Sequence, residues 1–240
     1  MEQLETRSIE EKLLHEMKYG CYANSERLPR ENLLAEKLNI SRTQLRDSLA
    51  ELEREGFISR RQGLGTLINH HVLNVPVRMD IEIEFMDMIR LSGHTPSEKL
   101  IKICPVYSAA IAARLGIAKT DEMLLVSRVV TADEKPAIYC EDYIPKALIK
   151  HDDYTELDLE TPIFYFLKQF CGKEAYLDIT EVRAIAANGS VAERLRIDTG
   201  TPVLYMDELD YDFEGSPVMY SRQYYIDGVI HHSVMRRKLT

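Results

Sequence analysis

Hydrophobic residues recur at helical spacing in three short runs near the start of the chain. The runs lie at residues 9–17, 33–38 and 42–55, and each places its apolar side chains on one side of a helix. Gly20 and Gly56 follow the first and third runs, at positions where glycine commonly ends a helix. The pattern therefore predicts three consecutive helices.

The pattern changes to short strands after the third helix. Residues 57–60 and 66–68 read as strands, and Gly63 and Gly65 lie in the turn between them. Helices joined by a tight turn and followed by a β-hairpin are typical of a winged helix-turn-helix. We therefore expect such a domain over residues 1–69.

The third helix carries polar side chains that suit DNA on the side opposite its leucines. Ser41 and Gln44 have the spacing of a capping box, which predicts that the helix begins after Ser41. Arg42, Thr43 and Arg46 then project from the first turns, away from the apolar face. Arginine in the major groove binds guanine or a phosphate, and threonine with the helix amides suits phosphates. A solvated helix with surface arginines is the alternative interpretation.

Charge is distributed unevenly along the chain, whose net charge is −9. Residues 1–75 hold 11 basic and 12 acidic residues, whereas residues 76–240 hold the other 19 and 27. An acidic chain does not attract nucleic acid through its average field, so DNA contact requires locally placed arginines. The near-neutral first third can supply them, and the acidic remainder is expected to have another role.

The remainder of the chain is predicted to form a second domain. Residues 70–80 are expected to be a linker, and residues 84–92 suggest a helix. Strands and short helices then alternate within residues 81–240, which predicts an α+β domain built on a mostly antiparallel sheet. The expected strands are 98–106, 123–131, 136–143, 175–184, 203–213, 217–226 and 232–236. The expected helices are 108–115, 162–171 and 190–195.

Composition excludes several classes of protein. Hydrophobic residues make up 45% and charged residues 29% of the chain, which is ordinary for a globular protein. No apolar run approaches the roughly 18 residues of a membrane span, and the N-terminus does not resemble a signal peptide. The four cysteines form no CxxC pair, so neither a disulfide framework nor a metal site is expected. We expect a cytoplasmic protein that has no membrane association and no cofactor.

Two sets of motifs follow known patterns. The first set includes Leu28-Pro29, Ser41-Arg42-Thr43, Glu55-Gly56-Phe57-Ile58 and Gly63-x-Gly65-Thr66. With these motifs, the N-terminal segment resembles the GntR family of bacterial transcription regulators. The second, looser set includes Gly93-His94-x-Pro96, Glu141-Asp142-Tyr143 and Ser221-Arg222-x-Tyr224-Tyr225. With these, the C-terminal segment is similar to the UTRA effector-binding domain of the HutC subfamily, which shares its fold with chorismate lyase.

The resemblance implies a homodimer that reads a pseudo-palindromic operator in double-stranded DNA with two recognition helices. It also implies that the wing tip approaches the minor groove, where glycine lets the backbone come close to DNA. Asn32 stands where relatives often have an arginine that grips phosphate, and Arg30 is expected to replace that contact. The expected DNA-binding residues are Arg30, Asn32, Ser41, Arg42, Thr43, Gln44, Arg46, Arg61, Gly63 and Gly65.

A small-molecule effector is implied for the C-terminal domain. Its expected binding residues are His94, Arg128, Glu141, Tyr143, Ser221 and Tyr224. Arg128 would pair with an acidic group and Glu141 with an amine or hydroxyl, unless the two pair with each other across strands. Relatives that sense sugar phosphates often carry Arg-x-Arg and Ser-Leu-Tyr motifs, whereas Val130 and Pro162 occupy two of those positions here. A sugar phosphate is therefore not the expected effector, because a dianion needs several charge-assisted bonds.

The predicted function is a ligand-responsive transcription regulator, most often a repressor, rather than an enzyme. Two alternatives remain: a constitutive DNA-binding dimer with a scaffold C-terminal domain, and a small-molecule enzyme with a DNA-binding appendage. The enzyme has little support from the residues, since neither a catalytic triad nor a nucleotide-binding loop is visible. A small molecule that shifts DNA affinity would exclude the constitutive alternative.

Overall fold

The chain forms two compact units, Met1–Pro76 and Val77–Thr240, in a computed structural model. The structure describes residues 9–61, 63–151 and 153–236. Each unit has buried core clusters of its own and is described by itself. Within the described ranges, no helix combines the length and the apolar surface that crossing a membrane requires.

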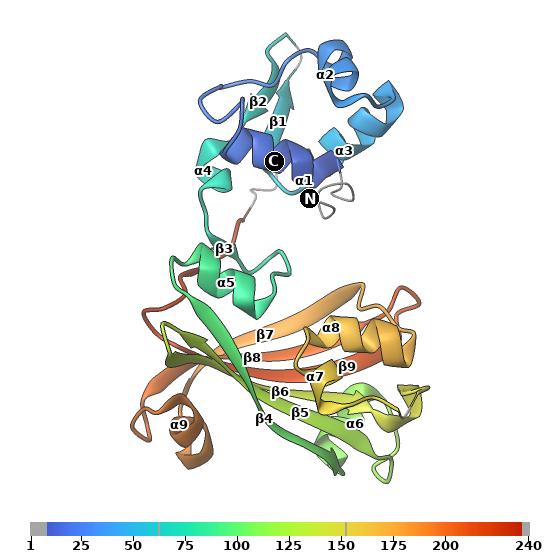
Figure 1. The fold of residues 1–240 in the computed structure, drawn as a ribbon, viewed down its shortest axis with the longest axis vertical. Helices are drawn as coiled ribbons and strands as arrows, with labels where there is room; N and C mark the ends of the chain where they lie inside the picture. The colour runs from blue at the N-terminus through green and yellow to red at the C-terminus, as the bar shows by residue number, and fades with distance from the viewer. Residues whose placement is uncertain (1–8, 62, 152, 237–240) are drawn as a thin grey trace. The chain divides into compact units, whose positions relative to one another are not determined.

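Three helices and a hairpin form the first unit, as the sequence predicts (Figure 1). They are α1 (Ile9–Lys18), α2 (Glu31–Leu38), α3 (Arg42–Arg54), β1 (Ile58–Arg61) and β2 (Gly65–Ile68), followed by α4 (His70–Leu73). The strands β1 and β2 pair in antiparallel register, and Arg27 adds a bridge to Leu67 of β2. The hairpin is therefore the wing of a winged helix-turn-helix.

The apolar residues of the predicted helical runs form the core of this unit. Leu13, Leu34 and Leu49 come from three different helices, and each is at most 1% exposed. Burying one such side chain contributes roughly 1.5–3 kcal/mol, so this core fixes the orientation of α3. Gly56 adopts a φ of 85° just after α3, which confirms its predicted place at the helix end.

The second unit is an α+β domain on a six-stranded antiparallel sheet, which confirms the predicted fold class. The strand order is β4-β5-β6-β9-β8-β7. The strands are β4 (Pro96–Val106), β5 (Met123–Ala132), β6 (Lys135–Pro145), β7 (Leu177–Ala186), β8 (Pro202–Tyr211) and β9 (Pro217–Ile226). The helical segments are α5 (Phe85–Leu91), α6 (Ala109–Leu115), η1 (Lys146–Leu148), α7 (Glu156–Leu159), α8 (Ile163–Phe166), η2 (Leu167–Cys171) and α9 (Gly189–Leu195). The short strands β3 (Val77–Arg78) and β10 (His232–Ser233) form a separate parallel pair.

The predicted linker at residues 70–80 holds two elements, α4 and β3. The helix α4 forms because Leu73 packs into the core of the first unit and His70 Nε2 lies 2.8 Å from the carbonyl oxygen of Ser25. The strand β3 belongs to the second unit, where it pairs with β10. The strand predicted at 232–236 is therefore β10, and it does not join the main sheet. Both elements are too short to show a period in the sequence.

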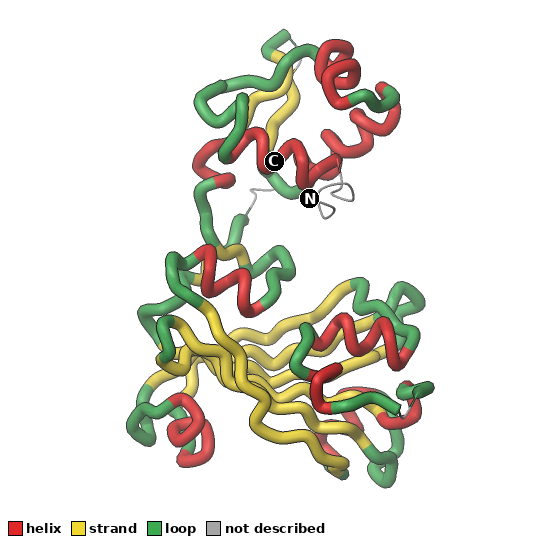
Figure 2. Tube along the Cα trace, viewed as in Figure 1, coloured by secondary structure: helices red, strands yellow, loops and turns green. Residues whose placement is uncertain are grey.

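Helices cover both faces of the sheet (Figure 2). On one face, α7 and α8 pack so that Phe166 shares a buried cluster with Val126, and α5 contributes Ile89 to a neighbouring cluster. On the other face, Ile111 of α6 and Leu195 of α9 are buried against the strands. We call these the α8 face and the α6 face of the sheet.

The sheet repeats one arrangement twice. A long strand, a seven-residue helix and a hairpin follow one another as β4, α6, β5 and β6, and again as β7, α9, β8 and β9. In the strand order, the first half runs from the edge to the centre and the second half runs from the centre to the other edge, with β6 next to β9. The second unit therefore has an approximate internal twofold relation.

The strand registers show which residues of the two halves correspond. Equivalent pairs are Glu98–Val130 and Asp178–Asp210, and Leu100–Arg128 and Thr180–Glu208. Arg128 on β5 and Glu208 on β8 are therefore counterparts, and so are Val130 and Asp210. The first half thus carries a basic side chain at a position where the second half carries an acidic one.

Candidate nucleic-acid interface and ligand pocket

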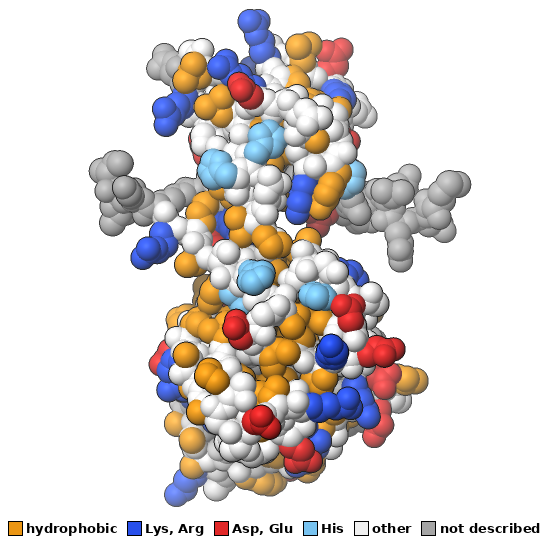
Figure 3. All heavy atoms as spheres, turned by 90° about the vertical axis from the view of Figure 1, so that its left-hand side faces the viewer, with side chains coloured by type: hydrophobic (Ala, Val, Ile, Leu, Met, Phe, Trp, Pro, Cys, Tyr) orange, Lys and Arg blue, Asp and Glu red, His pale blue; other side chains and the backbone are white. Residues whose placement is uncertain are grey.

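The first turns of α3 present polar side chains to solvent. Arg42, Thr43 and Arg46 are exposed, whereas Leu45 and Leu49 on the opposite side are buried. A recognition helix contacts base edges with this N-terminal end. Figure 3 shows several Lys and Arg side chains, with a few acidic ones among them, at one end of the first unit.

The capping box that the sequence predicts is present at the start of α3. The backbone N–H of Gln44 donates to Ser41 Oγ at 3.2 Å, and the backbone N–H of Ser41 donates to Gln44 Oε1 at 3.0 Å. These bonds engage two side chains that were expected to contact DNA. Their direct effect is to fix where α3 begins, and thereby where Arg42 and Arg46 stand.

The wing presents Arg61, Gly63 and Gly65 on its exposed side. The two glycines have φ values of 82° and 79°, a left-handed conformation that glycine adopts without strain. Arg60, by contrast, is tied to α3, because its Nε donates to Glu53 Oε2 at 2.8 Å. Arg61 is thus the arginine of this pair that faces solvent.

Arg30 and Asn32 lie at the start of α2, where both are exposed. Arg30 is the residue before the first turn, and its side chain makes no capping hydrogen bond there. A cation beside a helix N-terminus, whose free amides attract anions, suits a DNA phosphate.

The sheet divides most of the predicted effector residues between its two faces. Arg128 and Ser221 line a cavity on the α8 face. Tyr143 and Tyr224 belong to the buried clusters of the α6 face. Glu141 is two residues from Tyr143 on β6, so it points to the same face. The predicted effector site therefore grouped residues that lie on opposite faces of the sheet.

The ion pair between Arg128 and Glu141, one interpretation of the sequence, is wrong. The register of β5 and β6 places Arg128 opposite Cys140, which sends Glu141 to the other face. Glu141 instead accepts hydrogen bonds from the hydroxyl groups of Tyr139 at 2.9 Å and Tyr143 at 3.2 Å.

The predicted tyrosines of the α6 face form a packed aromatic group. Tyr224 stacks on Tyr139 with ring centroids 5.7 Å apart, and the guanidinium of Arg222 lies 5.8 Å from the ring centroid of Tyr143. Burial raises the pKa of Tyr224 to about 12, so its hydroxyl stays protonated at neutral pH. These side chains stabilise the centre of the sheet through contacts with one another.

His94 lies apart from both groups, beside the turn between β5 and β6. Its Nδ1 is 2.7 Å from Asp133 Oδ2, and the backbone N–H of Thr95 donates to Asp133 Oδ1 at 2.9 Å. The Thr95 bond first and then the His94 bond favour the charged carboxylate, which lowers the pKa of Asp133. His94 thus fixes the turn.

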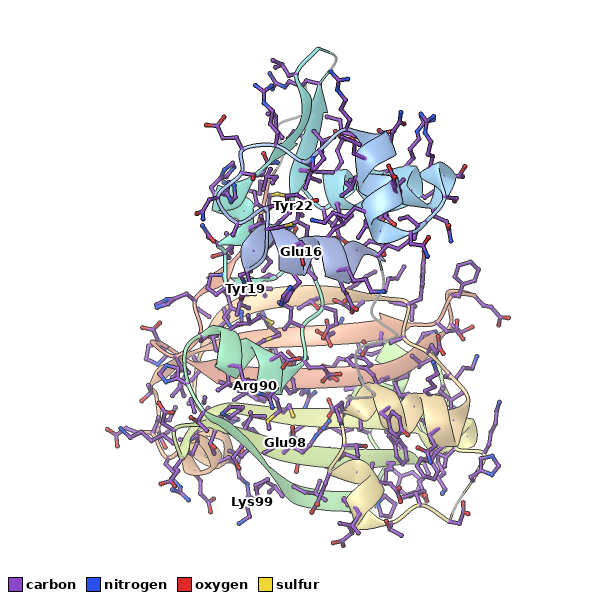
Figure 4. The ribbon with its side chains drawn as sticks, turned by 45° about the horizontal axis from the view of Figure 1, so that its top comes forward. Glu16, Tyr19, Tyr22, Arg90, Glu98 and Lys99 are labelled. Carbon is purple, nitrogen blue, oxygen red and sulfur yellow. The ribbon has the colours of Figure 1, made fainter. Side chains whose placement is uncertain are left out.

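Arg128 is the centre of an ion network on the α8 face. Its Nη2 donates to Asp142 Oδ2 at 2.5 Å, and its Nη1 donates to Glu98 Oε1 at 3.1 Å. Ser221 Oγ donates to the other oxygen of Asp142 at 2.7 Å, so the two predicted residues meet through this carboxylate. Glu98 stands on β4 beside α5, which carries Arg90 (Figure 4).

The polar side chains continue across the second half of the same face. Gln223 Nε2 donates to Glu208 Oε1 at 3.1 Å. The hydroxyl of Thr180 lies 3.1 Å from Glu208 Oε2 and 2.7 Å from Asp178 Oδ2. Each of the six strands therefore contributes a polar side chain to one line across the α8 face.

Two adjoining cavities lie over this line of polar side chains. The first, of about 20 Å³, is lined by residues that include Arg128, Asp142 and Glu208. The second, of about 170 Å³, is lined by Glu82, Phe164, Ala175, Tyr176, Leu177, Asp178 and Asp210. Glu82 and Phe164 line both cavities. The first holds about one water molecule, whereas the second admits a small organic group.

Burial raises the pKa of the carboxyl groups around these cavities. The Glu82 side chain is exposed, yet the protein atoms around its carboxyl group first, and then the negative charge of Asp178, raise its pKa to about 7. Burial first, and then the charge of Glu82, raises the pKa of Glu208 to about 8. The pKa of Asp210 also lies above its usual value, through burial and then the charge of Glu208. The second half of the pocket thus concentrates negative charge that a bound cation would stabilise.

Four acidic residues of the pocket were not predicted from the sequence: Glu82, Asp178, Glu208 and Asp210. The available signal was the alternation of Glu208 and Asp210 in β8, which marks one strand face as acidic. In the described part of the chain, no set of three or more His, Cys, Asp and Glu side chains could hold a metal ion. We therefore assign these carboxyl groups no metal.

A winged helix-turn-helix with outward arginines shares this chain with a domain that encloses a polar pocket. This combination defines a DNA-binding transcription regulator with a ligand-binding domain. The chain belongs to the family of proteins with a UTRA domain, whose model matches residues 91–227, and its residues 5–68 match the model of the gntR family of bacterial regulatory proteins.

Known relatives agree with this assignment. Over 214 residues the chain is 26% identical to the "Probable fructoselysine utilization operon transcriptional repressor" of Shigella flexneri, an alignment that covers 88% of this chain and 86% of that protein. It is 25% identical over 218 residues to the HTH-type transcriptional repressor NagR of Bacillus subtilis, covering 90% and 88%. Both relatives are named as transcriptional repressors, and neither is named as an enzyme.

A solved structure has the same fold. The possible transcriptional regulator YydK from Bacillus subtilis superposes with a TM-score of 0.78 at 19% identity, over 97% of this chain and 100% of that one.

Proposed function

We propose that the protein is a cytoplasmic repressor that binds a pseudo-palindromic operator as a homodimer and responds to a small molecule. The observation that carries the DNA-binding part is the exposure of Arg42 and Arg46 opposite a buried leucine face of α3. Relatives that are named repressors support the sign of regulation.

The proposed DNA contacts are of two kinds, those that recognise bases and those that bind the phosphate backbone and position the protein. Arg42 and Arg46 reach base edges in the major groove, and Thr43 binds a neighbouring phosphate. Arg61 and the glycines of the wing tip approach the minor groove, while Arg30 and Asn32 bind the backbone. Ser41 and Gln44 act mainly by fixing the start of α3.

The free edge of the sheet at β7 supports the homodimer. Ile179 is 63% and Val182 is 41% exposed on this strand. The opposite edge, β4, carries Lys99 and Lys102, and edge lysines are a common protection against strand pairing. Pairing of two β7 strands would bury these apolar side chains, and a dimer of any such kind carries two recognition helices for two half-sites.

The pocket on the α8 face is the proposed effector site. Carboxyl groups outnumber basic groups among the residues that line it, and the one basic side chain there, Arg128, already pairs with Glu98 and Asp142. This balance supports the expectation that the effector is not a sugar phosphate, since a dianion would be repelled.

Selection of bound duplexes from a random DNA library tests the DNA-binding part. The wild-type protein is expected to enrich an inverted repeat, because a symmetric dimer reads two equivalent half-sites. The double variant Arg42→Ala with Arg46→Ala is expected to enrich none. Arg54→Ala, at the far end of the same helix, is the matched control and should select the wild-type motif. Enrichment of the same motif by the double variant would contradict the assignment of α3.

A further inference from the structure

The two halves of the sheet differ in charge at equivalent positions. In the first half, the Arg128 guanidinium donates to both Glu98 and Asp142. In the second half, Asp178 is the counterpart of Glu98, while the position of Arg128 is taken by Glu208. In the first half, carboxylates therefore surround an arginine. In the second half, a carboxylate is present at the equivalent position, but the arginine is not.

Val130 adds to the difference, because its counterpart is Asp210. Asp210 is only 2% exposed, and among the described residues no hydrogen-bond partner reaches its Oδ2. An unpaired buried carboxyl oxygen is costly unless something supplies a donor. Asp210 also lines the 170 Å³ cavity, together with Asp178 and Glu82. The unpaired oxygen therefore lies at a space that a donor group can enter.

The donor that fits this space is an ammonium group. Three carboxyl groups line the cavity, and no basic residue is among its lining side chains. An ammonium has three N–H donors and one positive charge, which matches carboxylates on several sides.

A second unpaired atom indicates what else the ligand carries. The Nε of Arg128 is buried and has no hydrogen-bond partner within the described residues. Arg128 lines the adjoining cavity, whose volume of about 20 Å³ admits a single hydroxyl or carbonyl oxygen that would satisfy this N–H. The ligand is thus an amine that also bears oxygen.

We propose that the effector is a hydroxylated amine whose ammonium group binds among Glu82, Asp178 and Asp210, in the place that the arginine occupies in the first half. This inference rests on the proposed function, because it names the chemistry of the effector at the same pocket. The raised pKa values of Glu82, Glu208 and Asp210 agree with it, since a bound cation would favour the ionised forms of these groups.

Three small molecules of nearly equal size test the proposal. Ethanolamine is cationic at neutral pH, ethylene glycol is neutral, and glycolate is anionic. Each is titrated into the full-length protein without DNA, at constant ionic strength, and thermal unfolding is recorded. Ethanolamine is expected to raise the midpoint temperature saturably, because a ligand that binds the folded state stabilises it. A rise no larger than that given by ethylene glycol would overturn the proposal.

Variants locate the binding. Asp210→Asn is expected to weaken ethanolamine at least about tenfold, since a charge-assisted hydrogen bond is lost. Asp178→Asn should weaken it similarly. Both variants relieve repulsion between carboxyl groups, so neither is expected to unfold the domain. Glu181→Gln removes an exposed carboxylate from the opposite face of β7 and serves as the matched control. Wild-type affinity in both cavity variants would overturn the proposal.

Proton release gives an independent readout. Ethanolamine binding should release protons from the raised carboxyl groups, so calorimetric heats should differ between buffers of different ionisation enthalpy. Equal heats in both buffers would overturn the assignment to these carboxyl groups. Ethanolamine binding without operator binding would instead overturn the proposed function alone, and operator binding without ethanolamine binding would overturn this inference alone.

Discussion

Arg128 balances two carboxylates in the first half of the sheet. It is 2% exposed and bonds Glu98 and Asp142, so its removal leaves buried acids without a cation. Arg128→Met is therefore expected to lower the free energy of unfolding by about 3 kcal/mol or more. Urea denaturation measures this loss.

The control for Arg128 is an exposed ion pair. Lys168 and Glu174 are both about two-thirds exposed, at 67% and 68%, and Lys168→Ala should change stability far less than Arg128→Met because solvent screens the pair. Equal effects of Arg128→Met and Lys168→Ala would show that the buried network does not stabilise the fold.

The acidic half of the pocket predicts how stability depends on pH. The pKa of Glu82 is raised to about 7 and that of Glu208 to about 8, from a usual value of 4.5. The folded chain therefore binds more protons than the unfolded chain between about pH 4.5 and 8, and stability falls as pH rises through this window. Each such proton contributes a slope of up to about 1.4 kcal/mol per pH unit.

Thermal unfolding between pH 5 and 8.5 measures this slope. Carboxyls with lowered pKa, such as Asp80 and Asp212, act below about pH 4. Burial lowers the pKa of His232, which adds a slope of the opposite sign below about pH 6.5, but the carboxyl groups with raised pKa outnumber it. Glu208→Gln should flatten the profile, because a glutamine does not titrate. A midpoint temperature that rises from pH 5 to pH 8 would contradict the assignment of protonated carboxyl groups to the pocket.

Single residues of the site were predictable to different degrees. Arg128 and Ser221 were selected from the sequence, and both line the α8-face cavity. Glu141 was selected too, although it faces the other side, because choosing a face requires the register of β5 and β6. Asp210 was missed because the sequence around an acidic strand residue does not show whether its side chain faces a pocket or the solvent.

At the scale of elements, the two equivalent helices α6 and α9 end differently. Each ends in a left-handed residue, Gly116 with φ 67° and Arg196 with φ 55°. Glycine adopts this conformation without strain, whereas other residues lose about 1 kcal/mol or more. Gly116→Ala is expected to lower the free energy of unfolding by about 1 kcal/mol, and Arg196→Gly to raise it by a smaller amount.

Chemical denaturation of the two variants measures both changes. An added Cβ at Gly116 meets no atom within 4 Å, so the expected loss comes from backbone conformation alone. Opposite signs for the two variants support the equivalence of the helix ends. Losses of similar size in both would contradict it.

Long, periodic elements were predictable, and very short ones were not. The apolar spacing placed α3 correctly, and the capping box set its start at Arg42. The helix predicted at 162–171 is α8 followed by the π-helical η2, a distinction that spacing cannot make. The strands β3 and β10 have two residues each, and they form only by pairing across the second unit.

In the molecule as a whole, the internal repeat of the second unit is the feature that indicates the charge of the ligand. Its trace in the sequence is short, in the Arg-Leu-x-Ile motifs at 114–117 and 194–197. These motifs share the end of a helix, whereas the residues that matter most, Arg128 and Glu208, differ in charge. Only the strand registers show that they are counterparts.

The proposed dimer depends on the β7 edge. Ile179→Lys is expected to weaken self-association about tenfold or more, because an edge lysine opposes strand pairing and removes apolar contact. Leu157→Lys is the matched control, since Leu157 is 72% exposed on α7, away from the sheet edge. Sedimentation velocity over a concentration series measures both. A wild-type dimer that tolerates Ile179→Lys would place the interface elsewhere.

The central claim is that ligand binding in the UTRA domain changes DNA binding. The most direct measurement is the affinity for the selected duplex, by fluorescence anisotropy at physiological salt, with and without saturating ethanolamine. We expect the affinity to change at least about fivefold with ethanolamine and not at all with ethylene glycol, because coupling between sites is typically of this size or larger. An unchanged affinity while ethanolamine occupies the pocket would contradict it and make the protein a constitutive DNA-binding dimer.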